Sequence, residues 1–288
     1  MNHPDYNSPA ALRAFLDGNG MAMQKKFGQN FLVNGRARSK LIDSLDVSEG
    51  TKVWEVGPGL GCMTYEILER GGSVTAFEID RGFARLLKEL FSDYSERGSF
   101  SLVEGDVLRT WRKHFDENGS PDRFFGNLPY NIAAAIIADT ISGGLRFERA
   151  VVTIQKEVAQ RMRAKEGTES YSSFSVLCQW AYDIKNLLDL AGGNFWPAPN
   201  VASRALLLTR REDFPRCGSP NVFMMMIRRL FSLRRKTIRN NMLSIAGPEK
   251  TDEVLKAAGI EPGERVENLS VGTLLSLSDA LAAILKEE

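Results

Sequence analysis

The fold of this chain is decided by the stretch Lys52-Val53-Trp54-Glu55-Val56-Gly57-Pro58-Gly59-Leu60-Gly61. Its first part contains two valines and a tryptophan, which are typical of strands. Three alternating glycines follow at once, and glycine allows tight turning and a close approach of the backbone to a ligand. We therefore expect a strand that ends in a ligand-binding turn, as at the start of a doubly wound α/β sheet.

Strand-like and helix-like segments alternate along the chain around this turn. We expect further strands at residues 73–78, 100–104, 123–126, 150–154, 184–190 and 205–209. We expect helices at residues 35–45, 63–70, 81–91, 132–141 and 156–163. Alternation of this kind indicates βαβ units and a parallel sheet, so the expected fold class is α/β.

The sequence pattern divides the chain into three parts. Residues 1–24 are expected to form a poorly ordered N-terminal tail. Residues 25–215 form the expected α/β domain, and residues 216–288 a small all-helical domain. The helices expected in this last part are 222–244, 251–258 and 271–285. The boundary falls in the Pro- and Gly-containing stretch 213–220.

The composition is that of an ordinary globular protein, with 43% hydrophobic and 25% charged residues among 288. No apolar run approaches the roughly 20 residues that span a bilayer, and we expect no signal peptide. Cys62, Cys178 and Cys217 are widely spaced, and His3 and His114 are the only histidines. This pattern favours a cytoplasmic protein without a disulfide framework or a metal site. No heptad pattern stands out, so we expect a monomer.

Positive charge is concentrated in one segment. The net charge of the chain is only +1, but residues 204–239 carry ten Lys or Arg residues and two acidic ones. A basic block within a near-neutral protein is typical of a surface that meets a phosphate backbone. The alternative interpretation is a solvated helix face.

Polar residues follow the next three strands. Glu78 ends the second strand about 20 residues after the glycines, where an acid can accept hydrogen bonds from both ribose hydroxyls. Asp106 follows the third strand, where a carboxylate can accept from an adenine amine. Asn127 ends the fourth strand. Because ligands bind at the carboxyl ends of the strands in such sheets, these side chains are expected to share one site.

A glycine turn alone could equally belong to a nicotinamide enzyme. Two details oppose that reading. Pro58 interrupts the row of backbone N–H groups that would hold a pyrophosphate. Glu55 adds negative charge, which would repel a pyrophosphate but suits a cationic sulfonium ligand.

The tetrapeptide Asn127-Leu128-Pro129-Tyr130 indicates what is done with the ligand. The N6 amine of adenine is a poor nucleophile, and accepting both of its hydrogens makes it more reactive. The side-chain carbonyl of Asn127 and the main-chain carbonyl of Leu128 are suitable acceptors. Pro129 stiffens the turn, and Tyr130 offers a face on which an extruded base can stack. The motif therefore predicts methylation of an exocyclic base amine.

Taken together, these motifs resemble the S-adenosylmethionine-dependent rRNA adenine N6,N6-dimethyltransferases of the KsgA type over almost the full length of the chain. The segments that carry the resemblance are KKFGQNFL (25–32), EVGPGLG (55–61), FEID (77–80), GDVL (105–108), NLPYNI (127–132), QKEV (155–158), NFWPAPNVAS (194–203), FSLRRKTIRN (231–240) and RVENLS (265–270). The resemblance implies a Rossmann-like class I methyltransferase sheet, followed by a small helical rRNA-binding domain.

The resemblance also implies roles for single residues. The residues expected to contact S-adenosylmethionine are Asn30, Leu32, Gly57, Glu78, Asp106 and Asn127. Phe195 would stack on the target adenine opposite Tyr130. The residues expected to contact rRNA phosphates are Arg234, Arg235, Lys236 and Arg239. Asn200 and Ala202 depart from the family pattern, which has Lys and Asp there, so one positive charge is missing.

The implied activity is dimethylation of two adjacent adenines near the 3′ end of small-subunit (16S) rRNA, with the small ribosomal subunit as partner. Two alternatives remain open. One is a large-subunit (23S) rRNA adenine N6-methyltransferase of the macrolide-resistance type, which shares the cofactor and NLPY motifs. The other is an RNA-binding assembly factor for which catalysis is secondary.

Overall fold

The computed structural model describes residues 3–23 and 29–285, which form two compact units. The first unit consists of residues 1–159 and 184–210, and the second of residues 160–183 and 211–288. The division differs from the expected single boundary near residue 215. Residues 160–183 group with the C-terminal helices because Trp180, in this segment, packs against Phe214 and Phe223 at ring distances of 4.4 and 4.8 Å.

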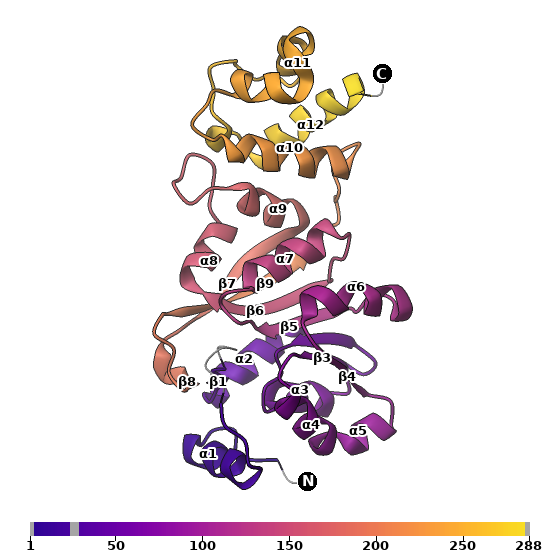
Figure 1. The fold of residues 1–288 in the computed structure, drawn as a ribbon, viewed down its shortest axis with the longest axis vertical. Coiled ribbons are helices and arrows are strands. Elements are labelled where there is room, and N and C mark those ends of the chain that lie inside the picture. The colour runs from indigo at the N-terminus through magenta and orange to yellow at the C-terminus, as the bar shows by residue number, and fades with distance from the viewer. Residues whose placement is uncertain (1–2, 24–28, 286–288) are drawn as a thin grey trace. The chain divides into compact units, whose positions relative to one another are not determined.

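A seven-stranded sheet carries the first unit (Figure 1). Its spatial order is β4-β3-β2-β5-β6-β9-β7. The strands are β2 (Lys52–Val56), β3 (Ser73–Glu78), β4 (Phe100–Glu104), β5 (Arg123–Asn127), β6 (Arg149–Gln155), β7 (Tyr182–Leu190) and β9 (Ser203–Arg210). The five strands from β4 to β6 are parallel, and β9 pairs with β6 in the antiparallel sense. The expected α/β class is confirmed.

The register of the sheet gathers the strand ends that carry polar residues. Val56 at the end of β2 is paired with Phe77 of β3 on one side and with Gly126 of β5 on the other. The chain reverses its direction of winding between β2 and β5, which is where ligands bind in doubly wound sheets. Gly57, Glu78 and Asn127 therefore come to one edge of the sheet.

Helices cover both faces of this sheet. They are α2 (Gly35–Leu45), α3 (Cys62–Glu69), α4 (Arg81–Leu90), α5 (Ser92–Glu96), α6 (Val107–Asn118), α7 (Ala133–Ser142) and α8 (Lys156–Met162). Side chains alternate along each strand. Val53 and Phe125 join the core with Leu41 of α2, whereas Trp54 faces the other way, against His114 of α6.

The expected N-terminal tail is a structured helix instead. Helix α1 (Pro9–Gly18) begins with the N-cap Ser8, whose hydroxyl accepts a hydrogen bond from the Ala11 N–H, and Pro9 occupies the first turn. Leu12 and Leu16 lie four residues apart on one face and are buried. Burial of this apolar face orders the segment, so the prediction of disorder was wrong.

The second unit consists mainly of helices. It contains α9 (Ser173–Ala181), α10 (Pro220–Ser232), α11 (Ile238–Ala257) and α12 (Val271–Leu285), with a 3₁₀ turn at Val266–Asn268. The helix expected at 222–244 is broken, because α10 ends at Ser232 and Thr237 caps a new helix at Ile238. Gly247, with φ 78°, and Pro248 place a kink inside α11.

Candidate active site

A cavity lies at the carboxyl ends of β2 to β5, entirely within the first unit. Its walls include residues 29–32, the glycine turn 57–59, and the strand-terminal residues Glu78, Asp106 and Asn127. All six residues expected to contact the cofactor therefore meet in one place. Of the expected lead-in segment 25–32, residues 25–28 lie outside the described residues.

The glycine turn has backbone angles that favour glycine. Gly57 and Gly59 have φ angles of 71° and 57°, which side chains of L-residues rarely adopt. A Cβ atom on Gly59 would stand 2.9 Å from Cε1 of Phe31, whereas one on Gly57 would meet open space. Gly57 therefore leaves its backbone exposed to the cavity, where a ligand can approach closely.

Glu78 presents a buried carboxylate to the cavity. Its residue is 6% exposed, and its Oε1 accepts a hydrogen bond of 2.8 Å from the Asp80 N–H. Burial raises the pKa of Glu78 to about 7, and the Asp80 charge adds to the rise while backbone N–H donors oppose it. Asp80 is also the N-cap of α4, and this cap fixes the loop between Glu78 and the helix. Glu78 is placed to accept hydroxyl hydrogens from a ligand.

Glu55 forms a second acidic wall, which the sequence had singled out only for its charge. It is 2% exposed, and its Oε2 accepts a 2.6 Å hydrogen bond from the Thr64 hydroxyl. Burial raises the pKa of Glu55 to about 7; the Thr64 bond opposes this rise and the Glu78 charge adds to it. Since a nearby cation favours the ionised form of both acids, this cavity suits a cationic ligand.

Asp106 caps α6 while one of its oxygens remains available. Its Oδ1 accepts a 3.0 Å hydrogen bond from the Leu108 N–H, and its Oδ2 lies 3.9 Å from the Arg109 guanidinium. Arg109 is largely exposed, so its hold on the carboxylate is weak. The second oxygen of Asp106 can therefore accept from an amine in the cavity.

The Asn-Leu-Pro-Tyr turn contains two carbonyl oxygens, of the Asn127 side chain and the Leu128 main chain, that accept no hydrogen bond from the residues that the structure describes. The Asn127 side-chain amide donates a 2.8 Å hydrogen bond to the Asn30 carbonyl, which leaves its own carbonyl oxygen to accept. The Leu128 N–H donates to Thr153, and its side chain is buried. No donor to the Leu128 carbonyl oxygen is found within residues 3–23 and 29–285. The Pro129 carbonyl instead accepts from the first turn of α7.

The two aromatic residues expected to hold the base differ in exposure. Tyr130 is half-buried, and its hydroxyl forms a 2.6 Å hydrogen bond with the hydroxyl of Ser203. Phe195 lies in β8 (Phe195–Trp196), which pairs with β1 (Phe31–Leu32) so that Leu32 is opposite Phe195. Phe195 is 4% exposed and belongs to the core, outside the cavity walls. The structure does not bring its ring to the cavity.

The β1–β8 pairing was missed by sequence reasoning. Each strand has only two residues, too few for a periodic pattern. The Asn34 side chain also donates a 2.9 Å hydrogen bond to the Asn194 side chain beside this pairing. The pairing ties the cofactor-side segment to the Phe-x-Pro-x-Pro segment, two motifs that the sequence treated as separate.

The cations expected to contact RNA lie in the second unit and are not equivalent. Arg239 makes a two-pronged ion pair with Asp252 at 2.7 and 2.9 Å. Arg234 lies 3.8 Å from Glu267. Arg235 and Lys236 are exposed, and neither side chain has an ion-pair partner among the residues that the structure describes. These last two offer their full charge to a polyanion.

Two absences apply to the described ranges. They contain no group of three or more potential metal-ligating side chains. They also contain no helix that is both long enough and apolar enough to cross a membrane.

Comparisons with known proteins place this site in a family. The model of the ribosomal RNA adenine dimethylase family matches residues 20–283. Ribosomal RNA small subunit methyltransferase A of Treponema denticola is 45% identical and covers 98% of this chain and 97% of its own length. The Treponema pallidum protein of the same name is 43% identical, with 98% and 99% covered.

Two solved structures share the fold. A dimethyladenosine transferase from Plasmodium falciparum has a TM-score of 0.72 at 24% identity, covering 85% of this chain and 94% of its own. The 23S rRNA methyltransferase ErmE has a TM-score of 0.63 at 23% identity, covering 87% and 99%.

The cavity also fits the family's methyl donor. Glu55 and Glu78 supply negative charge for a sulfonium, Glu78 and Asp106 supply hydrogen-bond acceptors, and Gly57 leaves open space for the ligand. The chain thus belongs to the ribosomal RNA adenine dimethylase family and is a methyltransferase that uses S-adenosylmethionine.

Proposed function

We propose that this enzyme transfers methyl groups to the N6 atoms of two adjacent adenines near the 3′ end of small-subunit (16S) rRNA, forming N6,N6-dimethyladenosine at each. The observation that carries the proposal is the held amide of Asn127 on the wall of the cofactor cavity, which leaves its side-chain oxygen to accept, with the adjoining Leu128 carbonyl as the second acceptor. The names of relatives at 43–45% identity support the small subunit as the target.

Each cofactor-binding residue contacts a different part of S-adenosylmethionine. S-adenosylmethionine supplies an electrophilic methyl group when it is bound. Glu78 accepts its ribose hydroxyls, Asp106 accepts its adenine amine, and Gly57 leaves room for its approach. Asn30 and Leu32 line the same cavity and cover the methionine end.

Asn127 and Leu128 act on the target amine. Their carbonyl oxygens accept its two hydrogens, which concentrates the nitrogen lone pair toward the methyl group. Because the Asn127 amide nitrogen is held by Asn30, its oxygen has a fixed direction before the base arrives. Catalysis in this scheme comes chiefly from positioning and needs no general base of unusual pKa.

Tyr130 and Phe195 are the proposed stacking partners of the extruded adenine. The bond between Tyr130 and Ser203 fixes the tyrosine ring, which supports its role. Phe195 must leave its buried position to reach a base, so its part requires a movement of β8.

RNA binding is assigned to the basic residues Arg234, Arg235, Lys236 and Arg239 of the second unit. Contacts of such residues with phosphates position the RNA without reading its sequence. The enzyme would act as a monomer on the small subunit, in the cytoplasm where that subunit is assembled.

The test is transfer of radiolabelled methyl groups to undermethylated small subunits, followed by nucleoside analysis. We expect N6,N6-dimethyladenosine at two sites, and none with Asn127→Ala. Protein-free large-subunit rRNA serves as the second substrate, and methylation of that RNA alone would overturn the proposal. Retained subunit binding without any transfer by the wild type would instead support an assembly factor.

A further inference from the structure

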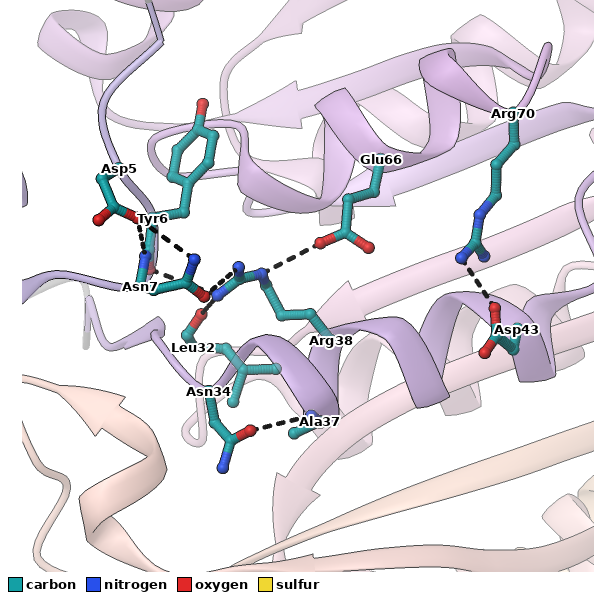
Figure 2. Close-up of polar contacts among 10 residues, drawn as sticks. All are labelled: Asp5, Tyr6, Asn7, Leu32, Asn34, Ala37, Arg38, Asp43, Glu66 and Arg70. Carbon is teal, nitrogen blue, oxygen red and sulfur yellow. Dashed lines mark hydrogen bonds and ion pairs between the residues drawn. The ribbon is translucent and has the colours of Figure 1, made fainter.

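A buried arginine joins three segments next to the cofactor cavity. Arg38 of α2 is 5% exposed, and Figure 2 shows its guanidinium directed toward the N-terminal segment, β1 and α3. Its Nη1 donates to the carbonyl oxygens of Leu32, at 2.9 Å, and Tyr6, at 3.3 Å. Its Nη2 donates to Asn7 at 2.8 Å, and its Nε pairs with Glu66 at 3.1 Å.

The segment that Arg38 holds is the N-terminal arm, residues 5–18. This arm has its own contacts with the site. The Tyr6 hydroxyl donates a 3.0 Å hydrogen bond to the carbonyl of Leu60, inside the glycine turn. Arg13 of α1 lies 5.8 Å from the centre of the Trp196 ring in β8. Leu12 and Leu16 anchor the arm in the same core as Phe31 and Leu32.

Arg38 and the arm depend on each other. A buried guanidinium is costly unless its N–H groups are hydrogen-bonded, and two of the four partners belong to the arm. If the arm leaves, Arg38 loses these partners and its hold on the Leu32 carbonyl is weakened. Leu32 follows Asn30 by two residues, and the Asn30 carbonyl orients Asn127.

The arm also lies outside the residues that the family model matches. The match begins at residue 20, after α1 ends at Gly18. The contacts of the arm with Leu60 and Trp196 therefore add support to the cavity from beyond the matched segment.

We propose that Arg38 is a positioning residue that clamps the N-terminal arm against β1 and α3, so that the arm keeps the glycine turn and residues 29–32 in the geometry that binds the cofactor. The inference rests on the cofactor site of the proposed function and is independent of the RNA target.

The main test replaces Arg38 by methionine, which fills the space without donating hydrogen bonds. The matched control is Arg70→Met, because Arg70 pairs with Asp43 and thereby also links α3 to α2, away from the arm (Figure 2). We expect Arg38→Met to weaken S-adenosylmethionine binding, measured by calorimetry, about tenfold. The KM for S-adenosylmethionine should rise while the KM for RNA stays constant, and Arg70→Met should match the wild type.

Two milder variants keep the test decisive if Arg38→Met does not fold. Tyr6→Phe removes the hydroxyl that bonds to Leu60 and to the His3 ring, and leaves Arg38 and its partners unchanged. Gly35→Ala keeps Arg38 but places a Cβ 2.7 Å from the Asn7 side-chain oxygen, which must shift away from the position where it accepts from Arg38. Each should weaken cofactor binding about threefold and speed hydrogen exchange in residues 29–33 and 57–61. Arg38→Lys, which keeps the charge, should recover part of the affinity lost in Arg38→Met.

The inference is overturned if folded Arg38→Met binds the cofactor as tightly as the wild type, or if Arg70→Met weakens binding equally. With no folded Arg38→Met, unchanged affinity in both Tyr6→Phe and Gly35→Ala overturns it. A wild-type enzyme that binds S-adenosylmethionine but leaves small subunits unmethylated would contradict the proposed RNA target alone.

Discussion

The side-chain amide of Asn127 donates a 2.8 Å hydrogen bond to the main-chain carbonyl of Asn30, which precedes it by 97 residues. The residue proposed to activate the target amine is thus oriented by the segment proposed to cover the cofactor. Since Asn30 adjoins β1, and β1 pairs with β8, the same link continues to Phe195. Hydrogen bonds thus connect the proposed cofactor-binding segment with both Asn127 and the strand that contains Phe195.

This link makes Asn127 sensitive to small changes. Asn127→Asp keeps the size of the side chain but directs a carboxylate oxygen at the Asn30 carbonyl, which repels it. We expect methyl transfer to fall by at least about a hundredfold, since misplacement of about 1 Å costs that much. The rate of methyl transfer to small subunits is measured under single-turnover conditions. Asn118→Asp, at an exposed position, is the control. Activity near the wild-type level would rule out the assigned role.

Substitutions at the two aromatic residues separate stacking from packing. Tyr130→Phe loses only the bond to Ser203 and should reduce kcat several-fold, whereas Tyr130→Ala should reduce it far more, because stacking is worth about 1–3 kcal/mol per base. Phe195→Leu should mainly lower the thermal stability of the enzyme, because the ring is buried. A large loss of kcat in Phe195→Leu at unchanged stability would instead mean that the ring reaches the base.

Cofactor affinity should increase with pH around neutrality. The pKa of Glu78 is raised to about 7, and its ionised form is the better acceptor for ribose hydroxyls. We expect the dissociation constant for S-adenosylmethionine to fall about tenfold between pH 6 and 8. Glu78→Gln should bind more weakly and show a smaller pH dependence, which calorimetry can measure. Glu104→Gln, at an exposed strand end, should behave as the wild type.

Glu55 should reduce stability at high pH. Its pKa is 4.5 in the unfolded chain and about 7 in the folded one, so the folded state binds more protons between these values. The free energy of unfolding therefore falls as pH rises through this window. Glu55→Gln can keep the Thr64 bond without the charge and should be more stable at pH 8, on the order of 1–3 kcal/mol. Thermal unfolding without cofactor should show that Glu55→Gln is little more stable than the wild type at pH 5. An equal stability gain at pH 5 and pH 8 would contradict this explanation.

The exposed and paired cations should differ in RNA binding. Replacing Arg235 and Lys236 together by alanine should reduce the slope of log affinity against log salt concentration by about two, which corresponds to the loss of about two phosphate contacts. Arg239→Ala should lower it by less than about one, because Asp252 already compensates this charge. Binding titrations at several salt concentrations measure these slopes. Equal effects of Arg235→Ala and Arg239→Ala would show that the ion pair with Asp252 does not persist in the complex.

Local signals were sufficient for much of the fold. The strands expected at 73–78 and 100–104 and the helices at 35–45 and 271–285 have the same bounds in the structure. The prediction of one helix at 222–244 was wrong, because helix-forming residues continue on both sides of the N-cap Thr237 and give no sign of a break. Helix α1 was not predicted, because its apolar face is short and only its contact with the core stabilises the helix.

The sequence by itself determined the α/β class, the glycine turn and the order of Glu78, Asp106 and Asn127 at successive strand ends, because strand periodicity and glycine turns are encoded by neighbouring residues. Only the tertiary structure decided the partners of Arg38, the pairing of Leu32 with Phe195 and the burial of Phe195. Those contacts join distant segments, and a local pattern does not specify which distant segment satisfies a buried hydrogen bond or covers an apolar ring.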